Sequence, residues 1–189
     1  MEYLIGKKIE NLSIRDKNFA TGDYENCVFI NCDFSNADLS HSNFLDCEFR
    51  DSNLSLVKLA QTSFRDVRFI NCKLLGLHFD DCNDLIITVD FEECILNLSS
   101  FYKLKLKKTR FKNSKIIEAD FTQTDLSNSV FDNCDLAKTT FMNTNLERAD
   151  FRTSFNYSID PEINRIKKAK FSLTWIMGLL DKYDIEIDK

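Results

Sequence analysis

Hydrophobic residues recur at every fifth position along most of the chain. One uninterrupted run of aromatic or aliphatic residues spans positions 9–79, and a second spans positions 91–151. A mostly small residue, such as Cys27 or Ala37, stands two positions before each of these central residues. Because residues two apart in an extended chain point to the same side, the central residue and its small companion face inward together. The other residues of each repeat then face solvent.

This period matches neither an α-helix nor a strand with alternating faces. It predicts a coil whose short extended sides are joined by tight turns, for which the many Asn, Asp and Ser residues are suited. If each coil takes twenty residues, every fourth central residue stacks in one column, and one column is phenylalanine throughout: Phe29, Phe49, Phe69, Phe91, Phe111, Phe131 and Phe151. We therefore predict an all-β solenoid over residues 1–171, a right-handed quadrilateral parallel β-helix built from repeats of five residues.

Two irregularities interrupt the predicted coil. The phenylalanine column keeps its register only if two extra residues lie between Phe79 and Phe91, and we place them in a bulge at residues 83–85. A surface loop is predicted near residues 155–163, where an Asp-Pro pair occurs. Phe171 lies twenty residues after the last member of the column, so the coil is expected to resume there.

The pattern changes after Phe171. Apolar residues then recur at helical spacing, so residues 172–189 are predicted to form a capping α-helix with Ser172 as its N-cap, followed by a tail. Such a helix would cover the open end of the solenoid, which otherwise exposes apolar side chains and unpaired strand edges. The stripe expected to form the cap is Leu173, Ile176, Met177 and Leu180. A second stripe, expected to join two copies as a homodimer through the C-terminal end, is Trp175, Leu179 and Tyr183.

The cysteines and the start of the chain favour a cytoplasmic location. All seven cysteines fall on small inward positions of the repeat, which predicts buried, reduced thiols. The segment after Met1 is too short and too charged for a secretory signal. The most apolar stretch, residues 173–180, is far shorter than a membrane span, so no membrane contact is expected.

No pattern of catalytic or metal-binding residues stands out. The chain has no CxxC pair, and its only histidines are His41 and His78. The repeat places nearly all carboxylates on the outside of a filled rod, and no glycine-rich phosphate loop occurs. We therefore expect a protein that is not an enzyme and that holds no metal or cofactor.

Charge is unevenly distributed along the chain. The formal net charge of −5 argues against direct nucleic-acid binding, which needs a basic footprint. Acidic residues gather in segments 16–48 and 80–93, whereas segment 103–112 is basic. The candidate acidic surface for a protein partner is Asp23, Glu25, Asp33, Asp38, Asp46, Asp80, Asp81 and Asp84.

One side of the predicted rod should neutralise its own charge. Two outward columns beside the phenylalanine column alternate in sign: Glu48, Arg68, Asp90 and Arg110 in one, and Glu92, Lys112, Asp132 and Arg152 in the other. Opposite charges on adjacent strands attract with a modest gain in stability. The partner surface is therefore expected on other sides, nearer the N-terminal half.

Two segments repeat a small residue, Asp or Asn, Leu or Phe, and then two variable residues: CDFSNADLSHSNFLDCEFRDSNLSL and ADFTQTDLSNSVFDNCDLAKTTFMNTNLERADFRT. This pattern covers about residues 9–171 and resembles the pentapeptide-repeat family. A rod of this size with a C-terminal cap is similar to the Qnr and MfpA quinolone-resistance type. That resemblance implies a dimeric DNA mimic that binds DNA gyrase or topoisomerase IV and modulates it or protects it from fluoroquinolones. The alternative is a scaffold that binds an unrelated protein.

Overall fold

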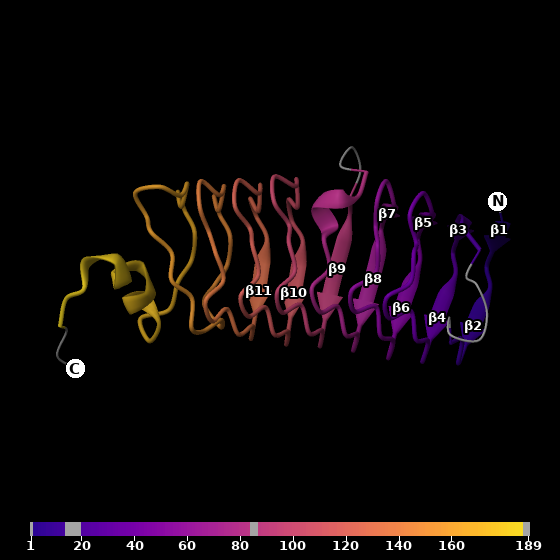
Figure 1. Cartoon of the computed structure of the whole chain (residues 1–189). Coiled ribbons are helices and arrows are strands. Elements are labelled where there is room, and N and C mark those ends of the chain that lie inside the picture. Colours follow the sequence, from indigo (N-terminus) through magenta and orange to yellow (C-terminus); the bar gives the residue numbers. More distant parts are fainter. Residues whose placement is uncertain (1, 14–19, 84–86, 187–189) are drawn as a thin grey trace.

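The computed structural model describes residues 2–13, 20–83 and 87–186, and these form a rod of stacked coils (Figure 1). The two ends of the chain lie at opposite ends of the rod. Parallel pairs join residues that are twenty apart, such as Phe29 with Phe49, so each coil contains four repeats of five residues. The expected four-sided parallel β-solenoid is confirmed.

Two of the four sides carry regular strands. Side 1 holds a four-stranded parallel sheet in the order β1-β3-β5-β7, and side 2 holds a seven-stranded sheet in the order β11-β10-β9-β8-β6-β4-β2. Side 1 consists of β1 (Glu2–Ile5), β3 (Gly22–Glu25), β5 (Asn43–Leu45) and β7 (Ser63–Arg65). Side 2 consists of β2 (Lys8–Glu10), β4 (Val28–Ile30), β6 (Glu48–Arg50), β8 (Val67–Ile70), β9 (Val89–Glu92), β10 (Arg110–Lys112) and β11 (Val130–Asp132).

The other two sides are held by single parallel bridges between successive coils. On side 3 the bridges run through Ser13, Asp33, Asn53, Lys73, Ile95, Lys115, Asp135 and Phe155. On side 4 they join Asp38 with Lys58, and then run through His78, Ser100, Asp120 and Thr140. Side 4 also carries the short 3-10 helix η1 (Phe79–Asp81).

Phenylalanine rings fill the centre of the rod in stacked columns. On side 2, Phe111 stacks between Phe91 and Phe131, with ring centroids 5.2 and 4.6 Å apart. The same stacking continues along the column from Phe29 to Phe171. A second column, which the sequence reasoning did not identify, meets the first edge to face and consists of Phe79, Phe101, Phe121 and Phe141. Stacked and edge-to-face rings are both favourable arrangements of aromatic pairs.

The corners of the coil hold residues in the left-handed backbone conformation. Asn31 and Asn71, for example, have φ angles of 52° and 51°. After glycine, asparagine and aspartate tolerate this conformation best. Their side chains also link neighbouring coils, because the Asn31 amide donates to Asn11 Oδ1 at 2.6 Å and the Asn71 amide donates to Asp51 Oδ1 at 2.7 Å. The abundance of Asn and Asp in the repeat is thus explained.

The small inward residues bond to the coil before them. Thr62 Oγ1 donates to the Leu39 carbonyl at 2.9 Å, and Cys72 Sγ donates to the Phe49 carbonyl at 3.3 Å. All seven cysteines are free and buried, as predicted. Burial raises the pKa of the Cys47 and Cys72 thiols to about 12. A thiol with such a pKa is almost entirely protonated at neutral pH and is therefore a poor nucleophile.

The cysteines give a direct test of this packing. In the native protein we expect a maleimide reagent to label almost none of the seven thiols at neutral pH, because they are buried and protonated. After denaturation in guanidinium chloride, all seven should react. Mass spectrometry of the two samples measures the difference. Rapid labelling of native protein would contradict the placement of the cysteines inside the rod.

The coils change register once in the middle of the chain. Val67 pairs with Val89 and Phe69 pairs with Phe91, so partners here are 22 residues apart instead of twenty. The two additional residues lie between Asn83, which donates its backbone N–H to the Thr62 carbonyl, and Thr88, whose carbonyl accepts from Val67. Residues 84–86 lie outside the described residues, so the bulge at 83–85 stays a prediction.

The prediction of a C-terminal capping α-helix is wrong for the described residues of that segment. The chain forms two short 3-10 helices instead, η2 (Ile176–Leu179) and η3 (Asp181–Tyr183). Ser172 is not an N-cap, because η2 begins after Trp175 and no side chain caps it. Gly178 lies in the middle of the expected helix, and glycine in the interior of an α-helix costs about 1 kcal/mol relative to alanine.

The expected surface loop near residues 155–163 turns partly inward. Tyr157 and Ile159 are buried, and the Tyr157 ring lies 5.9 Å from Phe151 and 5.7 Å from Phe171. The Ile159 backbone N–H donates to the carbonyl of Gly178 at 2.8 Å. This segment and the 3-10 helices therefore close the C-terminal end of the rod together.

Candidate protein-binding surface

The predicted acidic residues are spread around the rod. Asp23 and Glu25 lie in β3 on side 1, and Asp46 lies at the edge between sides 1 and 2. The others are Asp33 on side 3, and Asp38, Asp80 and Asp81 on side 4. Asp84 lies outside the described residues. The structure therefore does not bring the whole predicted set together on one side.

Two of these carboxylates are occupied by the turns that follow them. Asp33 Oδ1 accepts the backbone N–H of Ser35, and Asp38 Oδ1 accepts that of Ser40, both at 3.0 Å. Hydrogen bonds from the side chain and backbone of Ser40 hold the pKa of Asp38 below its usual value. The same turn recurs at Asp120, where Thr122 N–H donates at 2.8 Å. Asp33 and Asp38 thus have a structural role that needs no partner.

A smaller acidic group forms in the N-terminal half of side 1. Asp23 and Glu25 lie on one coil, Asp46 lies on the next, and Asp66 occupies the same corner as Asp46 one coil later. Asp46 and Asp66 are exposed, and none of the four forms an ion pair within the described part of the chain. We call Asp23, Glu25, Asp46 and Asp66 the acidic surface.

The acidic surface borders a shallow groove of about 280 Å³. Its lining is Tyr3, Asp23, Tyr24, Glu25, Asn43, Phe44, Leu45, Ser63 and Arg65. Two hydrogen bonds order its carboxylates: the Asn43 amide donates to Asp23 at 2.6 Å, and the Tyr3 hydroxyl donates to Glu25 at 3.2 Å. Sequence reasoning missed Asp66 and Tyr3. The spacing of twenty residues that relates Asp66 to Asp46 was the signal that could have found it.

The C-terminal half of side 1 has the opposite charge. Lys107 pairs with Asp125 at 3.4 Å and Arg165 pairs with Glu147 at 2.9 Å. Further cations on this half, without an ion pair among the described residues, are Lys105, Lys108, Arg148, Lys167 and Lys168. Side 1 is therefore acidic toward one end of the rod and basic toward the other, and no continuous acidic stripe runs along its described part.

Within the described residues, side 2 carries two of the six ion pairs expected between neighbours in its alternating columns. Glu48 is buried next to Arg50 and lies 2.5 Å from Arg68, and Lys112 lies 2.6 Å from Glu92. Asp90 accepts the backbone N–H of Arg110 at 2.8 Å instead of forming an ion pair with another described residue, so this side neutralises only part of its own charge.

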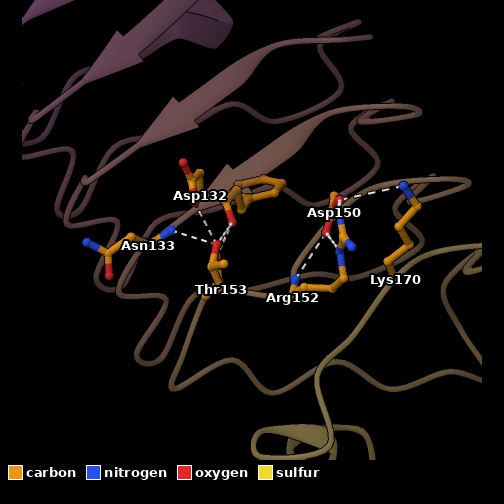
Figure 2. Close-up of polar contacts among 8 residues, drawn as sticks. Asp132, Asn133, Asp150, Arg152, Thr153 and Lys170 are labelled. Atoms are coloured by element: carbon orange, nitrogen blue, oxygen red, sulfur yellow. Dashed lines mark hydrogen bonds and ion pairs between the residues drawn. The ribbon is translucent and has the colours of Figure 1, made fainter.

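The last predicted pair on side 2 is wrong, as Figure 2 shows. Arg152 pairs with Asp150 at 2.8 Å instead of Asp132, and Lys170 lies 3.7 Å from the same carboxylate. Asp132 instead accepts a hydrogen bond from Thr153 Oγ1 at 2.9 Å. Arg152 and Asp150 are two residues apart on the same face of the chain, so they meet without reaching across coils. Hydrogen bonds from Arg152 lower the pKa of Asp150.

The C-terminal residues divide differently from the two predicted stripes. Leu179, expected to face a partner, packs against the core, whereas Leu173, expected in the cap, is 91% exposed. Trp175 and Tyr183 are exposed, while Ile176 and Leu180 are partly buried. The Tyr183 hydroxyl donates to Glu162 at 2.8 Å. The exposed apolar group at this end is therefore Leu173, Trp175, Met177 and Tyr183.

The described residues contain no cluster of three or more His, Cys, Asp or Glu side chains that could hold a metal ion. The cavities are shallow surface grooves, and one of about 420 Å³ lies over Val130, Asp132, Asp150 and Arg152. No helix in this part of the chain is long and apolar enough to cross a membrane.

The repeat that builds these surfaces matches a known family. The family described as "Pentapeptide repeat region" matches residues 23–84 and 85–156, more than half of the chain. The chain belongs to the pentapeptide-repeat family. No curated protein sequence matches it.

Solved structures of pentapeptide-repeat proteins share the whole rod. One trypsin-treated variant of QnrB1, a plasmid-mediated fluoroquinolone resistance protein, superposes with a TM-score of 0.67 at 18% identity, covering 97% of this chain and 99% of that one. A second trypsin-treated variant of QnrB1 has a TM-score of 0.63 at 20% identity, covering 99% of each chain. At these identities the likeness concerns the fold alone.

Membership of the pentapeptide-repeat family narrows where binding residues can lie. The inward positions and many Asp and Asn residues of the turns maintain the coil, so they carry no information about a partner. The outward residues without a structural role are the ones left for contact with a partner. In this chain these include the acidic surface and the exposed apolar group at the C-terminal end.

Proposed function

We propose that this pentapeptide-repeat protein is not an enzyme and that it binds DNA gyrase or topoisomerase IV as a local mimic of duplex DNA. The observation that supports this most directly is the acidic surface, whose carboxylates have no ionic partner among the described residues and lie on a regular side of the rod. A cytoplasmic location follows from such a partner. The fluoroquinolone resistance function of QnrB1, whose fold this chain shares, directs attention to the same enzymes.

The acidic surface has about half the charge density of DNA over a short distance, because its four carboxylates lie beside Arg65. Coils are spaced by about 4.8 Å, so the step from Asp23 to the level of Arg65 covers about 10 Å. Duplex DNA carries one negative charge per ~1.7 Å, or about six over that length. The acidic surface places Asp23, Glu25, Asp46 and Asp66 in a similar span. Mimicry is therefore local, and the basic half of side 1 limits its extent.

The C-terminal end supports a homodimer in this proposal. Leu173, Trp175, Met177 and Tyr183 expose apolar surface next to the closed end of the rod. Burying such a group against a second copy removes it from water, and a twofold axis at this end would leave both acidic surfaces free. A protein partner, not nucleic acid or a membrane, is the ligand that this arrangement fits.

A supercoiling assay with purified gyrase, with and without ciprofloxacin, tests the proposal. We expect the protein to inhibit supercoiling or to protect the enzyme from the drug. Asp46→Lys should weaken this effect about tenfold, because it reverses a charge at the centre of the acidic surface. Lysine already occupies the corresponding corner at Lys108, so the coil should tolerate the substitution.

Glu93→Lys is the matched control, because Glu93 is also an exposed corner residue with positive φ but lies between sides 2 and 3. Its activity should equal that of the unchanged protein. If the unchanged protein neither inhibits nor protects gyrase or topoisomerase IV, these enzymes are not its partner. If Asp46→Lys and Glu93→Lys behave alike, the acidic surface is not the contact.

A scaffold for another protein is the second candidate, and the opposite charges of the two halves of side 1 favour it. A partner with a complementary bipolar surface would dock in one orientation only. In that case affinity purification should recover one stable partner that is not a topoisomerase. Its binding should weaken both in Asp46→Lys and in a Lys108→Glu variant.

A further inference from the structure

The N-terminal end of the rod leaves two strand edges unpaired. Among the described residues β1 pairs only with β3 and β2 pairs only with β4, so each is the last strand of its sheet. Both strands lie at the N-terminal end of the rod (Figure 1). An unpaired edge presents a row of backbone N–H and C=O groups, which can pair with a strand of another chain.

The apolar core is incompletely covered at this end. Leu4 and Ile9 hold the inward positions of β1 and β2 and are only partly buried. One coil later the residues in the same positions, Tyr24 and Phe29, are 2% and 0% exposed. A further layer of strands on this end would therefore complete the burial of Leu4 and Ile9, which favours association.

Hydrogen bonds to the second coil show which backbone groups point to the open end. The N–H groups of Glu2 and Gly6 donate to the second coil at 3.1 and 2.8 Å, and that of Asn11 donates at 3.0 Å. Backbone groups alternate between the two edges of a strand, so the residues next to these positions turn the other way. The residues that point their N–H and C=O groups to the open end are Tyr3 and Ile5 in β1, and Lys8 and Glu10 in β2.

The same end of a second copy fits these edges. A twofold axis perpendicular to the rod reverses the direction in which the chain runs around each side, so strands that meet across it are antiparallel. When the axis passes through the corner between sides 1 and 2, which is Gly6 and Lys7, β1 of each copy lies against β2 of the other. Such a contact is self-complementary. The residues that face each other across it are Glu2 and Asn11, Tyr3 and Glu10, Leu4 and Ile9, Ile5 and Lys8, and Gly6 and Lys7.

This register matches the free backbone groups of the two strands. Tyr3 faces Glu10 and Ile5 faces Lys8, and these four residues are the ones whose N–H and C=O groups point to the open end. Directly opposed residues of this kind exchange two hydrogen bonds in an antiparallel ladder. A shift by one residue would set free groups against groups that already bond the second coil.

The side chains suit the same register. Leu4 faces Ile9 of the other copy, so two partly buried apolar side chains meet on the inward side. Residues 2–13 carry two acids and two bases, a net charge of 2 − 2 = 0, and none of the five opposed pairs combines like charges. Lys8 and Glu10 already pair at 2.7 Å within one copy, which reduces the repulsion that an exposed edge lysine would cause.

We propose that two copies of this chain join end to end through β1 and β2, so that both sheets continue from one rod into the other. The contact lies at the opposite end of the rod from the C-terminal dimer and does not depend on that dimer or on gyrase binding. Because side 1 of one copy continues into side 2 of the other, the two acidic surfaces do not face each other.

Cysteine cross-linking tests the register. Tyr3→Cys protein is mixed with Glu10→Cys protein in the presence of oxidised glutathione, and the seven native cysteines stay unreactive because they are buried. Directly opposed residues have Cα atoms about 5.5 Å apart, within the reach of a disulfide. We expect a cross-linked dimer in the mixture and little in either variant alone. Tyr3→Cys mixed with Lys8→Cys is the matched control, because these diagonal neighbours lie about 7–8 Å apart and should cross-link about tenfold more slowly.

Proline at Ile5 tests the backbone hydrogen bonds. The Ile5 N–H points to the open end, so Ile5→Pro removes a bond of the contact but none within the rod, and proline is tolerated in such an edge strand. In sedimentation velocity we expect Ile5→Pro to weaken association through this end about tenfold. Ile5→Thr keeps the N–H and a β-branched side chain, so it should weaken association by less than about threefold.

Both Ile5 variants should unfold at nearly the same temperature as the unchanged protein, which shows that the rod is intact. Equal cross-linking in the two mixtures, or none with Tyr3→Cys and Glu10→Cys, would overturn the proposal. Equal association of Ile5→Pro and Ile5→Thr would overturn it as well. A C-terminal dimer on its own would give association that neither Ile5 variant changes, so the failure of one contact is distinguishable from the failure of the other.

Discussion

Replacing Phe111 with alanine is expected to lower the free energy of unfolding by about 4 kcal/mol. Phe111 is fully buried at the middle of the longest ring column, stacked on Phe91 and Phe131 and in edge contact with Phe101 and Phe121. Alanine removes the ring and leaves a cavity that rigid coils on both sides cannot close. In a solenoid each coil is stabilised mainly by its two neighbours, so the damage separates the two halves of the rod.

Urea denaturation followed by circular dichroism measures this loss. Phe111→Leu is the matched control, because leucine fills the inward position of many other repeats, including Leu106 and Leu126. It should cost less than about 1.5 kcal/mol, since it keeps most of the buried volume. A second, earlier transition in Phe111→Ala would show that the halves unfold separately. Equal stability of the alanine and leucine variants would mean that ring stacking in this column contributes little.

The inner structure of the rod was predictable because one rule repeats along the chain. Each central residue meets the same neighbours one coil above and below, so the spacing of Phe29, Phe49 and Phe69 already determines the four sides and the parallel pairing. The register change near Thr88 followed from the same column, since only two additional residues keep Phe91 beneath Phe69.

The C-terminal end was not predictable in the same way, because it depends on contacts that no repeat encodes. The spacing of Leu173, Ile176 and Leu180 indicated an α-helix. The structure instead bends the chain so that Gly178 packs against the backbone of Tyr157 and accepts a hydrogen bond from Ile159. These residues are about twenty positions apart outside the regular coil, and helical spacing carries no information about them.

The candidate surface was predictable only in part, because outward positions serve two purposes. Asp38 and Asp46 look alike in the sequence, yet Asp38 accepts a hydrogen bond from the turn after it while Asp46 occupies a corner with its side chain in solvent. Position within the repeat separates them: outside the strands, aspartates just before a central residue, such as Asp33 and Asp120, bond the turn, whereas Asp46 stands two residues after one. Applying that rule with the coil length would have added Asp66 to the prediction.

Replacing Gly178 with alanine is expected to detach the closing segment from the end of the rod. A Cβ atom at this position would lie 2.0 Å from the backbone oxygen of Tyr157, far inside van der Waals contact, and a backbone atom cannot move aside as a flexible side chain can. The Ile159 hydrogen bond to the Gly178 carbonyl would be lost with the shift. We expect a loss of about 3 kcal/mol in the free energy of unfolding. The ion pairs of Lys182 with Asp160 and Glu162 should break as well.

Urea denaturation and limited proteolysis together separate this effect from a general loss of stability. In Gly178→Ala, trypsin should cut first at Lys182, whose side chain is only 23% exposed while it is paired. Met177→Ala is the matched control, because Met177 is adjacent and exposed, and its truncation should leave both stability and the cleavage pattern unchanged. If Gly178→Ala behaves like Met177→Ala, the segment does not close the rod through Tyr157. If it loses stability without faster cleavage at Lys182, the strain is absorbed in the last coils and the closing segment stays in place.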